Sequence, residues 1–242
     1  LQLLLRDHPE WRDFPAAVVK EDKPQGTILQ VNELARQFRV LPGMRYASGL
    51  SMAPGLRAGV VEPAAVTKAV DELTESLRRF SPNIEPNRDE PGVLWLDARG
   101  LDRLWPSLNR WGADIAEQLK LDGWHAAVVV GFTRFSTYAI ARGRLMDRRR
   151  LLILGDEEAE RRLCMTIPLD RLGLQSKARD GLAKIGVKNV GDLVALPSAG
   201  VMRRFGPEAE RLWRLAKGDR RPRLRPKAVQ APVSAVMHLD HG

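Results

Sequence analysis

The stretch NIEPNRDEPGVLWLDARG, residues 83 to 100, contains two strand-like segments on either side of a turn that holds proline and glycine. Two adjacent carboxylates, Asp89 and Glu90, lie in the middle of the stretch, and Asp97 follows the apolar run VLWL. Carboxylates beside a strand can hold the magnesium ions of a phosphoryl-transfer enzyme. The alternative is that the pair lies in an ordinary turn before a strand. The interpretation of the whole chain depends on this choice.

Strand and helix segments alternate around this stretch, from residue 58 to residue 152. The strand HAAVVVGF, residues 125–132, is apolar on both faces, as expected of a strand in the middle of a covered sheet. Apolar residues at helical spacing predict three helices, at residues 65–80, 106–122 and 136–146. This order predicts an α+β layer, a mixed sheet with helices packed on one face.

The flanking parts of the chain differ in character from this layer. Residues 1–57 contain short strands and helices separated by proline and glycine turns, which predicts a small mixed unit. Residues 153–222 predict helices separated by glycines, and therefore a small all-helical unit. Residues 223–242 begin as a basic, proline-rich linker, and a strand at their end is expected to start another domain.

Composition limits the class of protein. With 242 residues, 44% of them hydrophobic and 29% charged, the chain is expected to be globular and soluble. No apolar run approaches the roughly 20 residues that span a bilayer, so we expect no membrane contact. The single cysteine, Cys164, excludes an internal disulfide and a cysteine-rich zinc site and fits a cytoplasmic location. The histidines are scattered and predict no metal site.

Charge favours a polyanionic partner. The net charge is +9 and the isoelectric point is near 10.2, and contacts between basic side chains and phosphates release counterions. The alternative is that the basic composition reflects arginine-rich codon usage alone. The chain begins at Leu1 instead of methionine, so we expect residues to precede it.

The segment RLGLQSKARDGLAKIGVKNVGDLVAL, residues 171 to 196, resembles a helix-hairpin-helix, in which a glycine turn directs backbone N–H groups at a nucleic-acid phosphate. The motif usually has two glycines flanking one residue, whereas this turn offers only Gly173. The alternative is a helical connector whose glycines only cap helices. The candidate DNA-binding residues, expected to act without sequence preference, are Gly173, Lys177, Gly186, Lys188, Gly191, Arg203 and Arg204.

Taken in order, these pieces resemble the Y-family of translesion DNA polymerases. ARQFRVLPGMRYASGLSMAPGL looks like the fingers segment, IEP with VLWLD like the palm hairpin, and AAVVVGFTRFSTYAIAR like the following palm strand and helix. The resemblance implies a right-hand arrangement: fingers at 1–57, palm at 58–152, and a thumb with a helix-hairpin-helix at 153–222. Residues 223–242 would then be a linker and the start of a little-finger domain.

The resemblance implies a metal site, and the chain departs from it. The family has an Asp-Glu pair at the start of the second hairpin strand, and the alignment on VLWLD places Gly92 and Val93 there. Neither side chain offers the oxygen ligand that magnesium requires. Asp89 and Glu90 are then expected in the hairpin turn, facing water. The family's other acidic ligand would precede Leu1, so we assign no metal ligand and no cofactor.

The nucleotide-binding positions also depart from the family. The resemblance places Glu33 where the family usually has tyrosine, retains the triphosphate-binding arginine as Arg36, and puts Ile140 where it has lysine. Glu33 lies one helical turn before Arg36, so an ion pair between them is expected. These losses resemble the catalytically inactive branch called ImuB and imply no catalytic residues.

That branch implies a DNA-binding scaffold of damage-induced mutagenesis. Its implied partners are an error-prone replicative-type polymerase, a RecA-like protein and the sliding clamp, through segments beyond Gly242. Two alternatives stay open. One is an active translesion polymerase that uses magnesium, with the hairpin in another register. The other is a helix-hairpin-helix DNA-binding protein with an unrelated N-terminal domain.

Overall fold

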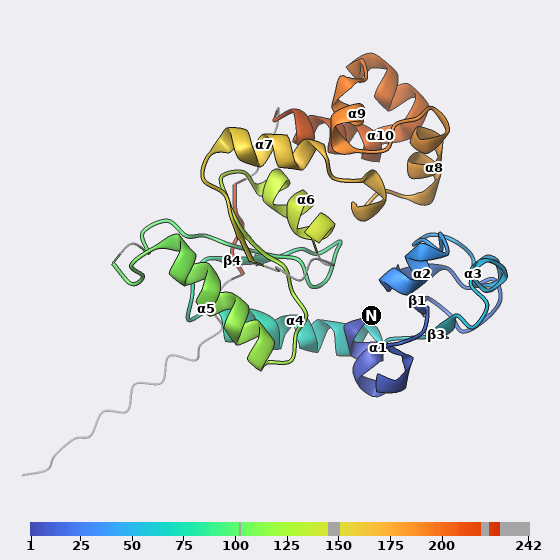
Figure 1. Ribbon diagram of the computed structural model, residues 1–242, viewed down its shortest axis with the longest axis horizontal. Helices are drawn as coiled ribbons and strands as arrows, with labels where there is room; N and C mark the ends of the chain where they lie inside the picture. Colours follow the sequence, from blue (N-terminus) through green and yellow to red (C-terminus); the bar gives the residue numbers. More distant parts are fainter. Residues whose placement is uncertain (102, 145–150, 219–222, 228–242) are drawn as a thin grey trace, which may run out of the picture.

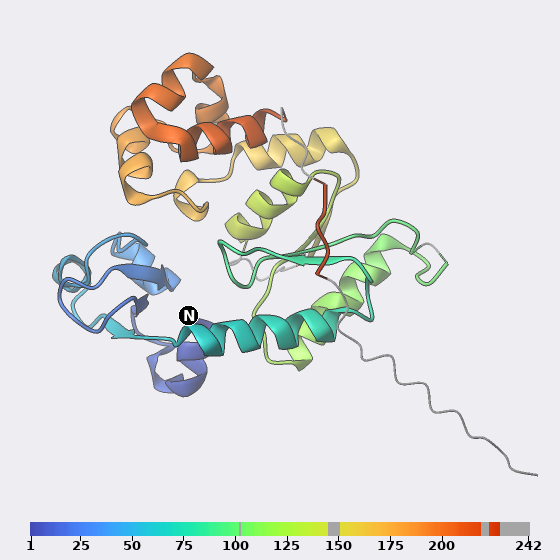
Figure 2. The same cartoon turned by 180° about the vertical axis from the view of Figure 1, so that it is seen from behind.

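The structure, a computed structural model, describes residues 1–101, 103–144, 151–218 and 223–227 (Figure 1). Within this part of the chain, buried apolar side chains form three clusters that follow one another along the sequence. The blue N-terminal unit and the orange C-terminal helices lie toward the same end of the central part, to the right in Figure 1 and to the left in Figure 2. No described helix combines the length and apolar character that crossing a bilayer demands.

The N-terminal unit is a three-stranded sheet with two short helices on it. Strand β1 is fully buried and lies between β2, antiparallel to it, and β3, parallel to it. Residue 57, after which the sequence predicts a boundary, begins β3 of this sheet. The elements are α1 (Gln2–Asp7), η1 (Pro9–Trp11), β1 (Ala16–Val19), β2 (Ile28–Val31), α2 (Glu33–Gln37), α3 (Tyr46–Met52) and β3 (Arg57–Gly59).

The central part contains two pairs of strands. β4 and β5 form an antiparallel hairpin, and β6 and β7 pair in parallel. Trp111 on α5 donates its indole N–H to the Phe80 carbonyl oxygen, 2.8 Å away, and this bond joins α5 to the segment that follows α4. The elements are α4 (Pro63–Leu77), β4 (Ile84–Pro86), β5 (Leu94–Leu96), α5 (Leu108–Leu121), β6 (Val128–Val130), α6 (Arg134–Arg144) and β7 (Leu151–Ile153).

Helices cover both sides of these strands, so the expectation of helices on one face was wrong. α4 and α5 lie on one side and α6 on the other (Figure 1, Figure 2). The reason is that the apolar face of α6, with Phe135, Ala139 and Ile140, packs in one cluster with the C-terminal helices. The expected boundary at residue 152 falls inside β7, whose Ile153 packs against the central cluster.

The C-terminal unit is helical. Helix α10 is broken at Gly206, where φ is 84°, directly before Pro207, which agrees with the expectation of helices separated by glycines. The elements are α7 (Glu157–Met165), η2 (Leu169–Arg171), α8 (Ser176–Lys184), α9 (Val190–Ala195) and α10 (Ser198–Lys217).

Residues 223–227 return to the central part and lie along β4. The Lys227 N–H donates to the Ile84 carbonyl oxygen at 2.8 Å, and the Arg225 N–H donates to the Glu85 carboxylate at 2.5 Å. Arg134, at the start of α6, donates to both Glu85 oxygens and to the Arg223 carbonyl oxygen. The strand expected near the end of the chain lies outside the described residues.

Candidate nucleotide and nucleic-acid site

The hairpin between β4 and β5 places Asp89 and Glu90 in its turn, as the sequence predicts. The strands pair Ile84 with Leu96 and Pro86 with Leu94, and the Asn87 N–H closes the turn on the Val93 carbonyl oxygen at 2.8 Å. Gly92 has φ of +93°, a value that side chains disfavour, which explains a glycine there.

Glu90 does not face water, so that part of the prediction was wrong. Its carboxylate accepts a hydrogen bond from the Tyr138 hydroxyl on α6 and lies 3.5 Å from Arg142 Nε. A Cβ atom on Gly173 would stand 2.5 Å from Glu90 Oε1, so the turn touches the C-terminal unit. Burial, and then the neighbouring Glu90, raise the pKa of Tyr138. Asp89, by contrast, is exposed.

The described residues do not fit a magnesium pair. Gly92 and Val93 offer no side-chain oxygen. Glu90 is bound by Tyr138, and the Asp97 carboxylate is held by Arg99, whose hydrogen bonds lower its pKa. No group of three or more histidine, cysteine, aspartate or glutamate side chains that could hold a metal occurs in the described part of the chain.

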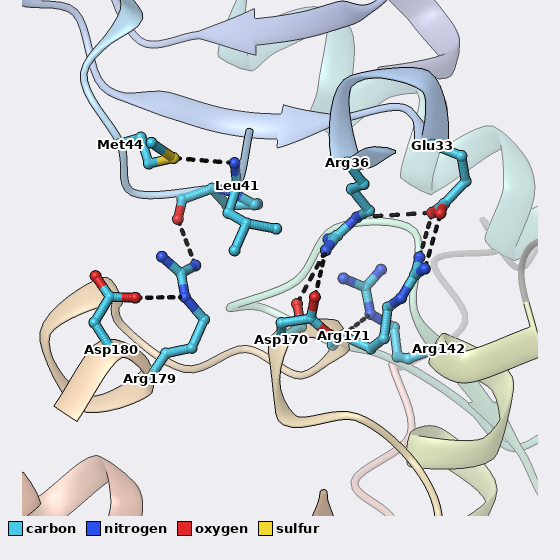
Figure 3. A network of polar contacts seen from close by, with 10 residues as sticks. Glu33, Arg36, Leu41, Met44, Arg142, Asp170, Arg171, Arg179 and Asp180 are labelled. Carbon is cyan, nitrogen blue, oxygen red and sulfur yellow. Dashed lines mark hydrogen bonds and ion pairs between the residues drawn. The ribbon is translucent and has the colours of Figure 1, made fainter. Parts of the chain in front are cut away.

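Glu33 and Arg36 lie together on α2 and face the C-terminal unit (Figure 3). The Asn32 side chain accepts from the Ala35 N–H at 2.9 Å and so starts the helix directly before Glu33. The expected ion pair is present, with Arg36 Nε 3.7 Å from Glu33 Oε1. The stronger partner of Glu33 is Arg171, whose guanidinium donates to both carboxylate oxygens.

Arg36 is enclosed by this network. Its guanidinium lies 3.5 Å from the Asp170 carboxylate and donates to the Asp170 carbonyl oxygen, and its side chain is only 11% exposed. Burial lowers the pKa of Arg36, and the neighbouring Arg171 lowers it further. Glu33 is 22% exposed, so the pair is partly shielded from solvent. A phosphate that approached Arg36 would have to displace two carboxylates.

Further polar contacts join the N-terminal unit to the C-terminal helices. Arg179 on α8, which is 7% exposed, donates to the Pro42 carbonyl oxygen at 2.8 Å, and Gly43 approaches Ser176 so closely that a Cβ would lie 2.9 Å from its Cβ. Arg142 on α6 donates to the Arg171 carbonyl oxygen at 3.0 Å, and this bond joins the central part to η2 (Figure 3). No local sequence pattern marks these partners, because Glu33 and Arg171 are 138 positions apart.

Ile140 is fully buried in the C-terminal cluster. The buried members of that cluster are apolar and include Ile167, Leu169 and Leu172. A lysine at this position would place its ammonium group among them, without the solvent it requires.

The Gly173 turn has its backbone donors occupied within the chain. The Gly173 N–H donates to the Tyr138 hydroxyl oxygen at 3.2 Å, and the Gln175 N–H donates to Glu208 Oε2 at 3.0 Å. Lys177, in the first turn of α8, is exposed.

In the second glycine turn, Gly186 follows the end of a helix whereas Gly191 lies within the next one. Gly186 follows the end of α8 with φ of +82°, and its N–H donates to the Ala183 carbonyl oxygen at 3.0 Å. Gly191 lies inside α9, with the Met165 carbonyl oxygen 3.2 Å from where a Cβ would stand. The Lys188 N–H is bound by Asp192 at 2.9 Å, a hydrogen bond that lowers the pKa of that carboxyl.

The basic side chains of this unit are open to solvent, whereas the backbone N–H groups of the turns are hydrogen-bonded within the chain. Lys188, Arg203 and Arg204 are all exposed, as Lys177 is. The exposed cations can meet a phosphate without any rearrangement, whereas the backbone donors of the turns already have partners.

Comparisons with known proteins agree on one family. The model of the IMS family, described as the impB/mucB/samB family, matches residues 1–138. Protein ImuB of Caulobacter vibrioides is 29% identical over 167 residues, which are 69% of this chain and 35% of that protein. DNA polymerase IV of Pseudomonas syringae pv. tomato is 27% identical over 221 residues, which are 90% of this chain and 61% of that protein. The chain thus spans less than two thirds of either relative.

Solved structures agree in fold. DinB from Sulfolobus solfataricus superposes with a TM-score of 0.66 over 93% of this chain and 66% of its own, at 16% identity. A ternary complex of Dbh superposes with a TM-score of 0.62, also at 16% identity. Since the family model matches residues 1–138, more than half of the chain, the chain belongs to the IMS (impB/mucB/samB) family.

Proposed function

We propose that the protein is a non-catalytic, polymerase-like DNA-binding scaffold of damage-induced mutagenesis. The observation that carries this proposal is the state of the nucleotide-binding positions. Arg36 is held by Glu33 and Asp170, and Ile140 is buried in an apolar cluster. An incoming nucleotide triphosphate carries several negative charges and would meet two carboxylates before it reached Arg36.

The metal positions support the same proposal. Two-metal nucleotidyl transfer needs acidic ligands that hold two ions about 4 Å apart. The chain has Gly92 and Val93 where these ligands would be expected, and Glu90 is engaged by Tyr138 and Arg142. The proposed function therefore includes no magnesium-dependent nucleotidyl transfer.

DNA binding would come from exposed cations of the C-terminal helices. Lys177, Lys188, Arg203 and Arg204 are exposed, and contacts of this kind recognise the phosphate backbone without reading sequence. The chain is similar to Protein ImuB over 167 residues. We include in the proposal the three protein partners that the sequence resemblance to that branch implies: an error-prone replicative-type polymerase, a RecA-like protein and the sliding clamp.

An active translesion polymerase is the second candidate. It is favoured by the relatives named DNA polymerase IV, one of which matches 90% of this chain. In that case Glu90 would have to leave Tyr138 and bind metal.

Primer extension distinguishes the two candidates. The full-length protein is incubated with primer-template DNA, all four deoxynucleotides and either magnesium or manganese, beside an active Y-family polymerase as a positive control. We expect no added nucleotide under conditions in which a gel-shift assay shows bound DNA. Template-directed extension that disappears in Glu90→Ala would overturn the scaffold proposal.

A further inference from the structure

A carboxylate from another helix is hydrogen-bonded to the Gly173 turn, residues 173–175. In a helix-hairpin-helix, a DNA phosphate would bind at this turn. Glu208 follows the break in α10 by two residues, and its Oε2 atom accepts the Gln175 N–H at 3.0 Å. Gln175 is the N-cap residue of α8 and makes no side-chain cap of its own. The anion that satisfies this helix start therefore comes from another helix of the same unit.

The second donor of the turn is held in a similar way. The Gly173 N–H donates to the Tyr138 hydroxyl oxygen at 3.2 Å, and that hydroxyl in turn donates to the Glu90 carboxylate. Gly173 and Gln175 are exposed, so solvent reaches the turn although both N–H groups are bonded internally. Two acidic side chains, one from the hairpin turn and one from α10, thus flank the same three residues.

A phosphate and a carboxylate compete for such donors. Each backbone N–H makes one good hydrogen bond, and hydrogen bonds to charged acceptors are stronger than those to neutral ones. A phosphate placed at the turn would also meet the negative charge of Glu208 at close range.

We propose that Glu208 is an autoinhibitory contact, an internal anion that competes with the DNA backbone for the Gly173 turn. Tyr138, backed by Glu90, holds the second donor in the same way. The inference rests on the proposed function, in which this unit binds DNA through phosphate contacts. The protein then binds DNA through Lys177, Lys188, Arg203 and Arg204, and the turn adds its donors only after Glu208 has moved away.

Glu208→Gln tests the contact directly, because it keeps an acceptor of the same shape and removes the charge. The affinity of the full chain for a fluorescent DNA duplex is measured by anisotropy at several salt concentrations. We expect the variant to bind about fivefold more tightly, the ratio that separates a charged from a neutral hydrogen bond.

Glu158→Gln is the matched control. It removes the same charge from a side chain that is 80% exposed on α7 and paired with Arg162. Any gain that both variants share reflects net charge, and only the excess in Glu208→Gln reflects the turn.

Tyr138→Phe provides an independent variant. It removes the hydroxyl and leaves the Gly173 N–H free for a phosphate, so it should also bind DNA more tightly than the parent. If Glu208→Gln fails to fold, as judged by circular dichroism, Tyr138→Phe decides alone.

The outcomes separate this inference from the proposed function. If the parent binds DNA and neither Glu208→Gln nor Tyr138→Phe exceeds Glu158→Gln, the autoinhibitory contact is refuted and the scaffold proposal stands. If the parent binds DNA and Glu208→Gln or Tyr138→Phe binds more tightly than Glu158→Gln, the autoinhibitory contact is supported. If the parent and all variants fail to bind at low salt, both ideas are refuted.

Discussion

Removing the Glu33 carboxylate should weaken the attachment of the N-terminal unit to the C-terminal helices. Glu33 accepts two hydrogen bonds from Arg171 and lies 3.7 Å from Arg36. Glu33→Gln removes the negative charge that lies between the guanidinium groups of Arg36 and Arg171. These two cations repel each other, and Arg171 therefore lowers the pKa of Arg36. The variant therefore loses an attraction and leaves a repulsion between Arg36 and Arg171.

The magnitude follows from the burial of the pair. Exposed ion pairs contribute about 0 to 1 kcal/mol, and breaking a fully buried pair costs about 3 to 5 kcal/mol. Both side chains are 22% exposed and the geometry is bidentate, so we expect Glu33→Gln to cost about 2 kcal/mol. The coupling energy between Glu33→Gln and Arg171→Gln should be about 1 kcal/mol, since the double variant also removes the uncompensated cation.

A double-mutant cycle measures this coupling. The free energy of unfolding is obtained from urea titrations for the parent, both single variants and the double variant, at low and at high salt. The exposed pair Glu158 and Arg162 on α7 is the matched control, with an expected coupling of about 0.3 to 0.5 kcal/mol. Additive effects at Glu33 and Arg171, within about 0.3 kcal/mol, would refute the idea that this pair joins the two units.

Three further predictions concern the proposed nucleotide and DNA contacts. Calorimetry should detect no binding of deoxynucleotide triphosphate at near-millimolar concentration, and Glu33→Tyr should improve it only slightly; micromolar affinity in the parent would contradict this. Ile140→Lys should lower the free energy of unfolding by about 3 kcal/mol or more in urea titrations without creating nucleotide affinity, because Ile140 is fully buried; a stable variant would show that the site accepts a cation. The Arg203→Ala, Arg204→Ala double variant should bind DNA more weakly and reduce the slope of log affinity against log salt by about 1.8; an unchanged slope would place DNA elsewhere.

The sequence predicted local features better than contacts between distant segments. The hairpin turn at Asp89 and Glu90 was confirmed, because turn residues and the apolar run after them are close in sequence. The orientation of Glu90 was wrong, since its partner Tyr138 lies 48 positions away and no local pattern marks it. The expected ion pair of Glu33 with Arg36 is present, because the two residues are three positions apart on one helix. The stronger partner of Glu33, Arg171, is 138 positions away, so no local pattern predicts it.

The boundaries between units show a related limit. The boundaries expected after residues 57 and 152 stay predictions: residue 57 lies in β3, which pairs with β1, and residue 152 lies in β7, which pairs with β6. Strand pairing is a property of the folded backbone, and short strands such as Arg57–Gly59 carry little pattern of their own.

The short segment 223–227 determines where a mechanical load on the C-terminal tail would act. The chain leaves α10 at Lys217 but is fastened again at Ile84, and Lys227 Nζ also lies 2.6 Å from the Asp71 carboxylate. A force that pulls on the residues after Lys227 is therefore applied first to β4 and α4, and the helices of the C-terminal unit stay unloaded until these bonds break. Arg134 on α6 donates to the Glu85 carboxylate and to the Arg223 carbonyl oxygen. A tilt of α6 and a force on the residues after Lys227 would therefore both act on the Glu85 carboxylate.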